Sequence, residues 1–121
     1  MEKNILIIED DEFFRELITK KLLSSGFGIS QAIDGQSGIE KAKEVKPDLI
    51  LLDLLLPGVD GFEVLSTLKS SPDTSSIPVV ILSNLDSKED VEKGLKSGAS
   101  DFLIKSQFAL DEVVKKIKSY L

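Results

Sequence analysis

Short aliphatic runs alternate along the chain with amphipathic stretches, a pattern that predicts strands alternating with helices. The run that follows Asn4 is entirely aliphatic, which is typical of a strand covered on both faces. The run from Phe27 is more polar, which favours a place at the edge of a sheet. The expected strands cover residues 4–8, 27–32, 48–53, 78–82 and 100–104, and the expected helices cover residues 11–25, 36–45, 61–69, 87–96 and a last stretch from about Gln107.

Glycines and polar residues mark the ends of several expected helices. Gly26 and Gly98 stand where a glycine commonly ends a helix. Asp60 and Ser87 stand where a side chain commonly caps a helix start. Helical periodicity predicts inward faces made by Phe14, Leu17, Ile18 and Leu22 on the first helix and by Phe108, Leu110, Val113, Val114, Ile117 and Leu121 on the last.

The order of these elements predicts the fold class. Strands that alternate with helices favour a parallel sheet wrapped by helices. We therefore expect an α/β protein of (βα)5 type that forms one domain over residues 1–121.

One carboxylate lies in an unusual place. Asp53 stands inside an aliphatic run that stops at Pro57-Gly58. An ionised carboxylate in such a strand is costly unless charge, metal or hydrogen bonds compensate it. Asp53 is therefore a candidate functional residue, although an aspartate that only caps the next turn would look the same in isolation.

Polar side chains also follow other expected strands. The first strand ends in Glu9-Asp10-Asp11, the fourth in Ser83 and the fifth in Lys105. Because ligands of an open parallel sheet bind outside the carboxyl ends of its strands, these groups should meet Asp53 at one edge.

This set of groups fits phosphoryl transfer. Converging carboxylates repel one another, and Mg²⁺ held by carboxylates relieves that repulsion. Asp53 could then act as a nucleophile that forms an aspartyl phosphate. The Ser83 hydroxyl and the Lys105 ammonium would bind the remaining phosphoryl oxygens.

Composition removes several other classes of function. The chain has no histidine, which excludes imidazole catalysis and imidazole metal sites, and no cysteine, which excludes disulfides and thiol chemistry. Its net charge of -6 and pI near 4.7 argue against a nucleic-acid-binding face. The start of the chain shows no secretion signal, so we expect a cytoplasmic protein that does not enter a membrane.

Together these motifs carry a resemblance that covers essentially the whole chain. They are Ile5-Leu6-Ile7-Ile8-Glu9-Asp10-Asp11, Asp53 with Leu-Pro-Gly-Val-Asp-Gly at 56–61, Ser83 after Pro-Val-Val-Ile-Leu, and Gly-Ala-Ser-Asp-Phe-Leu-Ile-Lys at 98–105. The chain resembles the receiver domain of two-component response regulators, in particular the single-domain chemotaxis regulators.

The resemblance implies a flavodoxin-like three-layer sandwich with strand order 2-1-3-4-5. It implies that Asp10, Asp53 and the backbone carbonyl of Leu55 ligate Mg²⁺ directly and that Glu9 acts through water. It further implies that Asp53 is the phosphoacceptor, that Ser83 and Lys105 bind the phosphoryl group, and that Phe102 holds the switch aromatic position beside Ser83.

The implied partners are a histidine kinase or histidine phosphotransfer protein and a downstream protein target or output domain. The implied surface for the downstream partner is made by the fourth helix, the fifth strand and the last helix. Such a protein is a phosphoacceptor that assists only its own phosphorylation and dephosphorylation, not an enzyme.

Four positions depart from the family pattern. Lys105 is followed by Ser106 where proline is usual, so we expect a trans peptide there and regard Ser106 as a candidate cap of the last helix. Phe102 lacks the hydroxyl of the commoner tyrosine, and a plain core phenylalanine remains an alternative. Leu55 and Leu85 are apolar, which predicts slow hydrolysis of the aspartyl phosphate.

Other functions fit the sequence less well. Phosphatases with an aspartate nucleophile have an Asp-x-Asp motif at that residue, and the sequence Asp53-Leu54-Leu55 lacks the second aspartate. The acidic residues after the first strand would repel the phosphate of a flavin, and the glycine-rich loop of nucleotide-binding proteins is missing. A pseudo-receiver that binds partners without phosphorylation remains an alternative function because Ser106 replaces the usual proline. Periodicity predicts that Phe14 lies in the core, whereas the resemblance implies a kinase-docking surface there, and both alternatives stay open.

Overall fold

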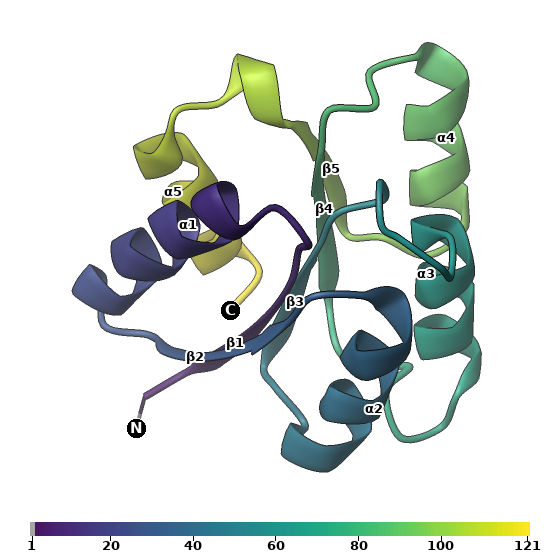
Figure 1. The fold of residues 1–121 in the computed structure, drawn as a ribbon, viewed down its shortest axis with the longest axis horizontal. Helices are drawn as coiled ribbons and strands as arrows, with labels where there is room; N and C mark the ends of the chain where they lie inside the picture. The colour runs from purple at the N-terminus through teal and green to yellow at the C-terminus, as the bar shows by residue number, and fades with distance from the viewer. Residues whose placement is uncertain (1) are drawn as a thin grey trace.

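Five parallel strands form one sheet in the order β2-β1-β3-β4-β5, with helices on both faces (Figure 1). The computed structural model describes residues 2–121. The strands are β1 (Asn4–Ile8), β2 (Gly28–Ala32), β3 (Leu49–Leu52), β4 (Val79–Ser83) and β5 (Asp101–Ile104). The helices are α1 (Glu12–Ser24), α2 (Gly35–Val45), α3 (Gly61–Ser70), α4 (Lys88–Lys96) and α5 (Leu110–Ser119), and a 3-10 turn, η1, covers Lys105–Gln107. The expected α/β fold, its strand order and the edge position of β2 are therefore confirmed.

Alternation along each strand divides the core into two layers. In β1, Leu6 and Ile8 pack on the face covered by α2, α3 and α4, whereas Ile5 and Ile7 pack on the face covered by α1 and α5 (Figure 1). All four side chains are at most 1% exposed. Because both faces are covered, the central strands need aliphatic residues at every position, which explains their uninterrupted apolar runs.

The expected caps are present. Gly26 and Gly98 have φ values of +94° and +110°, a left-handed conformation that glycine adopts without steric cost. The Asp60 side chain accepts a hydrogen bond from the Phe62 N–H, and the Ser87 side chain accepts one from the Asp90 N–H. These contacts fix the starts of α3 and α4 and thus the loops that precede them.

The last helix begins later than expected, so its predicted start at about Gln107 is wrong. The candidate cap Ser106 lies in the 3-10 turn, and the helix is instead capped at Ala109, whose N–H donates to Glu112 Oε1 at 2.9 Å. A glutamate that reaches back to the residue before its helix satisfies a backbone donor there. This contact places the helix start at Leu110.

Two apolar residues that periodicity placed inward face solvent instead. Leu17 is 42% exposed because the inward stripe of α1 is narrow and is centred on Ile18 and Leu22. Leu121 is 39% exposed because α5 ends at Ser119. None of the helices within residues 2–121 has the length and apolar character needed to cross a lipid bilayer.

Candidate functional site

Two neighbouring strands bring the acidic residues together. Ile8 of β1 pairs with Leu52 of β3, and the Asp53 N–H donates to the Ile8 carbonyl at 3.0 Å. The residues that follow the two strands, Glu9-Asp10 and Asp53, therefore lie side by side. One carboxylate oxygen from each of Glu9, Asp10 and Asp53 lies within 4.8 Å of the other two.

Asp53 is buried, and both of its carboxylate oxygens accept hydrogen bonds. Its residue is 5% exposed. Asp53 Oδ1 accepts the Leu55 N–H at 3.1 Å, and Oδ2 accepts a hydrogen bond from Lys105 Nζ at 3.0 Å. A positive charge and a backbone donor thus compensate the carboxylate that looked costly in the sequence.

Lys105 follows β5 and reaches across the edge of the sheet to the acidic residues that follow β1 and β3. Its ammonium also donates to Glu9 Oε1 at 2.5 Å, and only 11% of the Lys105 side chain is exposed. Burial disfavours the ammonium, but the hydrogen bond to Glu9 and the charge of Asp53 outweigh burial and raise the pKa of Lys105. The lysine therefore stays charged.

Glu9 is more deeply buried than the exposed Asp10. Burial, followed by the nearby charge of Asp53, raises the pKa of Glu9 to about 7, although the hydrogen bond from Lys105 acts in the opposite direction. The folded chain therefore favours the neutral form of Glu9 more strongly than the unfolded chain does.

This shift predicts a pH dependence of stability. Between the ordinary Glu9 value of 4.5 and the folded value of about 7, the folded chain binds more protons than the unfolded chain. The contribution of neutral Glu9 to the free energy of unfolding is thus complete below pH 4.5 and is lost as the pH rises through 7, by about 3 kcal/mol in total. Urea unfolding at a series of pH values, with a chelator to remove metal, measures it.

The matched variant for this prediction is Glu9→Gln, which cannot titrate. The difference in unfolding free energy between wild type and Glu9→Gln should change across this pH range, because other carboxylates contribute equally to both proteins. Two curves that stay parallel from pH 4.5 to 7 would contradict the assignment to Glu9.

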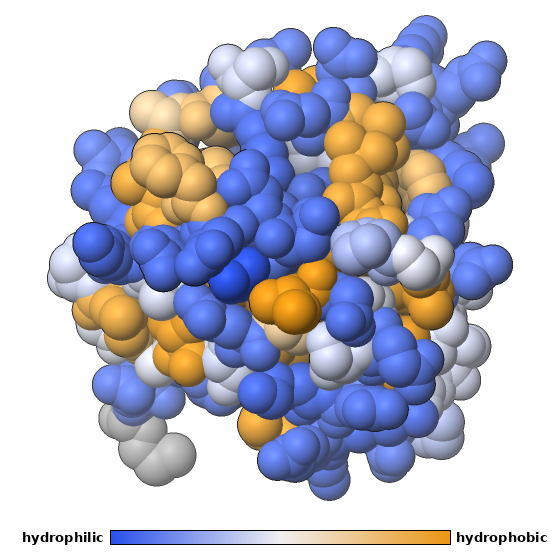
Figure 2. All heavy atoms as spheres, in the orientation of Figure 1, coloured by the Kyte–Doolittle hydropathy of each residue, from blue (hydrophilic) through white to orange (hydrophobic). Residues whose placement is uncertain are grey.

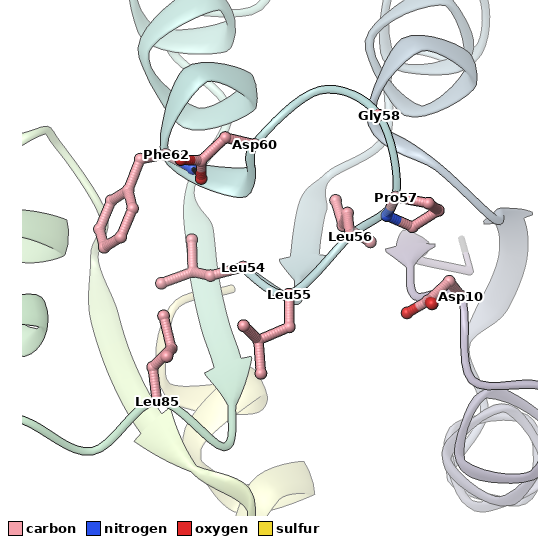
Figure 3. A pocket seen from close by; sticks show the side chains of 9 residues that line it. All are labelled: Asp10, Leu54, Leu55, Leu56, Pro57, Gly58, Asp60, Phe62 and Leu85. Atoms are coloured by element: carbon pink, nitrogen blue, oxygen red, sulfur yellow. Dashed lines mark hydrogen bonds between the residues drawn. The ribbon is translucent and has the colours of Figure 1, made fainter.

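Beside the acidic cluster opens an apolar cleft of about 590 Å³ (Figure 3). Its walls come from the loop between β3 and α3, from the start of α3 and from Leu85 in the loop after β4, and Asp10 stands at one side. Leu55 is 51% exposed there. Figure 2 shows an apolar strip amid hydrophilic surface between the sheet and α4. The approach to Asp53 on this side is therefore lined mainly by aliphatic groups.

Ser83 and Phe102 lie on the neighbouring strands β4 and β5. Ser83 is fully buried, and its Oγ accepts the Leu85 N–H at 3.4 Å. Because Ser83 pairs with Ile104, it stands beside the residue that precedes Lys105. Phe102 is 8% exposed and packs in the core under α4, where a methyl group added to Gly94 would lie 2.9 Å from the Phe102 ring. The aromatic side chain is thus in its inward position.

Two further contacts at the site were not predicted from the sequence. Arg15 Nη1 donates to the Glu9 carbonyl at 3.0 Å, so a side chain of α1 supports the loop that carries the acidic pair. Lys105 Nζ lies 4.3 Å from the centre of the Phe14 ring. The sequence signal that could have predicted these contacts is an aromatic residue and an arginine in the first turn of the helix that follows the acidic pair. The Lys105–Ser106 peptide is trans, as expected.

The donor set suits a hard divalent cation. Three carboxylates converge, one of them exposed at the cleft, and oxygen ligands of this kind are those that Mg²⁺ prefers. Within residues 2–121, Lys105 forms ion pairs with Glu9 and Asp53 but not with Asp10, so the Asp10 carboxylate remains available to a cation.

Comparison with known proteins assigns the family. The model of the response regulator receiver domain matches residues 5–118. The chain belongs to this family. Receiver domains accept phosphoryl groups from partner proteins and are not enzymes that turn over a separate substrate, which agrees with the function expected from the sequence.

One relative with a similar sequence is about twice as long as this chain. The chain is 40% identical over 117 residues to the DNA-binding dual master transcriptional regulator RpaA of Synechocystis, and the match covers 97% of the chain but 48% of that protein. The chain therefore spans about half the length of this relative.

Solved receiver structures superpose closely. The activated N-terminal receiver domain of Klebsiella pneumoniae RstA has a TM-score of 0.90 at 29% identity, covering 98% of this chain and 97% of that one. The chemotaxis protein CheY4 of Vibrio cholerae has a TM-score of 0.92 at 24% identity with full coverage of both chains, which shows a shared fold.

Proposed function

We propose that this receiver domain, residues 1–121, accepts a phosphoryl group on Asp53 from the phosphohistidine of a histidine kinase or histidine phosphotransfer protein. One observation carries the proposal. The Asp53 carboxylate lies within reach of two other carboxylates and is held by the Lys105 ammonium at 3.0 Å. We further propose that it acts in the cytoplasm, as receiver domains usually do.

The reaction we propose is a nucleophilic displacement. An oxygen of Asp53 bonds to phosphorus while the bond between phosphorus and the histidine nitrogen breaks, and the imidazole leaves with that electron pair. The histidine must come from the partner because this chain has none. Lys105 would move from the Asp53 oxygen to a phosphoryl oxygen, and the buried Ser83 hydroxyl would bind another.

Glu9, Asp10, Asp53 and the backbone carbonyl of Leu55 would hold Mg²⁺. When bound, the cation neutralises the charge that otherwise builds up between the carboxylates and the incoming phosphoryl oxygens. Asp10 is the exposed member and lines the cleft, so it is the carboxylate that a cation arriving from solvent reaches first.

Phosphorylation would be read out on the surface made by α4, β5 and α5, where a downstream protein target or output domain binds. Phe102 packs against the position of Gly94 in α4, so any movement of its ring changes the support beneath that helix. The charge added at Asp53 would draw Ser83 and Lys105 inward and so bias the position of Phe102.

Intact mass spectrometry tests the proposal. Incubation with Mg²⁺ and phosphoramidate, a small phosphodonor, should add one phosphoryl group that alkali removes. Asp53→Asn should abolish the adduct, whereas Asp73→Asn, a change at an exposed loop aspartate, should leave it in place. A wild-type chain that gains no phosphate would instead favour the alternative function, a pseudo-receiver that binds partners independently of phosphorylation.

A further inference from the structure

The ring of Phe14 lies against the lysine of the site. Lys105 Nζ is 4.3 Å from the ring centre, within the range in which an ammonium is attracted to the negative face of an aromatic ring. Phe14 belongs to the first turn and a half of α1, whereas Lys105 follows β5 at the other end of the chain. The contact therefore joins α1 to the end of β5.

The ammonium is surrounded by three groups. It has three hydrogens to donate, of which one is directed to Glu9 Oε1 and another to Asp53 Oδ2. The Phe14 ring covers a further side. Because 11% of the Lys105 side chain is exposed, the attraction to the ring acts in a largely desolvated place, where it is strongest.

The ring is itself held in place. Phe14 is half-buried and packs against the core layer beneath α1 and α5. It shares with Glu9 and Asp53 the lining of a void of only about 10 Å³, so the ring and the two carboxylates are closely packed. A side chain packed in this way cannot swing away from the lysine without opening a cavity.

We propose that Phe14 is a positioning residue for phosphoryl transfer, which confines the Lys105 ammonium to the side that faces Asp53. The inference rests on the proposed function of Asp53 and Lys105. Lysine has a long, flexible stem that would otherwise sample several orientations. The ring removes orientations that point toward α1 and leaves those that point toward the carboxylate that receives the phosphoryl group.

The adjacent residue provides a contrast. Phe13 is 76% exposed and packs in neither core layer. Phe14 packs against the core layer and lies over Lys105, which agrees with its helical periodicity. The docking of a kinase on this helix stays a prediction.

The rate of phosphorylation by phosphoramidate with Mg²⁺ tests the proposal, because this donor has no protein surface that could dock on α1. Phe14→Leu keeps an apolar side chain but removes the ring face, and it should slow phosphorylation about fivefold. Phe14→Tyr keeps the ring face and should restore the rate. Phe13→Leu is the matched control and should leave the rate unchanged.

Two readouts separate positioning from a general structural effect. In the Lys105→Met background, Phe14→Leu should cause no further loss of rate, since the lysine it positions is absent. In wild-type protein, the methylene protons next to Lys105 Nζ should resonate upfield of those of the exposed Lys20, because the Nζ atom to which that methylene group is bonded lies over the Phe14 ring. This NMR measurement requires no variant to fold.

The outcomes discriminate between the two proposals. A wild-type chain that gains no phosphate overturns the proposed function and this inference with it. A wild-type chain that is phosphorylated, but no faster than Phe14→Leu, overturns the inference alone. So does an equal loss of rate from Phe14→Leu in the wild-type and Lys105→Met backgrounds, or the absence of the upfield shift.

Discussion

Replacing Gly61 with alanine should lower the free energy of unfolding by about 3 kcal/mol, because the new methyl group has no room. A Cβ atom at Gly61 would lie 2.3 Å from the Cα of Leu54 and 2.6 Å from the Leu54 carbonyl oxygen. Carbon atoms in contact are normally about 3.5–4.0 Å apart. Both opposing atoms belong to the backbone, so no rotamer change can relieve the overlap.

The functional consequence follows from the position of Leu54, which directly succeeds Asp53. The Gly61 N–H donates to the Leu54 carbonyl at 3.2 Å, so the start of α3 is bonded to the loop that leaves the site. Separating the two elements to admit a methyl group would displace that loop. We therefore expect Gly61→Ala to slow phosphorylation of Asp53 as well as to destabilise the chain.

Urea denaturation followed by circular dichroism measures the stability change, and Gly58→Ala is the control. Gly58 lies in the same loop with φ of +74° and no atom within 4 Å of the added methyl group. Its substitution should cost only the left-handed backbone penalty, about 1 kcal/mol. If both variants lose the same stability, steric overlap at Leu54 is not the reason that glycine is needed at position 61.

The carboxyl ends of the strands explain why so much of the site could be predicted. A strand covered on both faces is recognisable from its aliphatic run, and the residue after the run must then lie at the edge of a parallel sheet. Glu9, Asp53 and Lys105 were predicted to meet for that reason, and the contacts of 2.5 and 3.0 Å from the Lys105 ammonium bring them together.

Contacts that depend on a side-chain direction within a helix or loop could not be predicted in the same way. Helical periodicity predicted that Phe14 and Leu17, nearly one turn apart, both face inward. The Phe14 ring lies against Lys105, whereas Leu17 is 42% exposed. The start of α5 likewise depends on one hydrogen bond from the Ala109 N–H to Glu112, which competes with the capping potential of Ser106. Such choices are decided by packing against distant parts of the chain.

The aliphatic cleft beside Asp53 predicts a long-lived aspartyl phosphate. Hydrolysis requires a water oxygen to attack phosphorus while the bond from phosphorus to the Asp53 oxygen breaks. Leu55 and Leu85 line the cleft, and neither side chain can orient or deprotonate that water (Figure 3). Leu55→Asn combined with Leu85→Glu would supply an amide and a carboxylate at these two positions.

We expect the double variant to lose its phosphate at least about tenfold faster than wild type, since a positioned acid or base contributes roughly 100-fold or more in favourable geometry. The measurement is the time course of the phosphorylated mass after the donor is removed, at constant Mg²⁺. Leu55→Met with Leu85→Met keeps the lining apolar and should match the wild-type rate. Because Leu85 also packs against the core, a urea midpoint for each variant separates faster hydrolysis from partial unfolding. An unchanged rate in the Asn/Glu variant would mean that the lack of polar side chains at positions 55 and 85 does not limit hydrolysis.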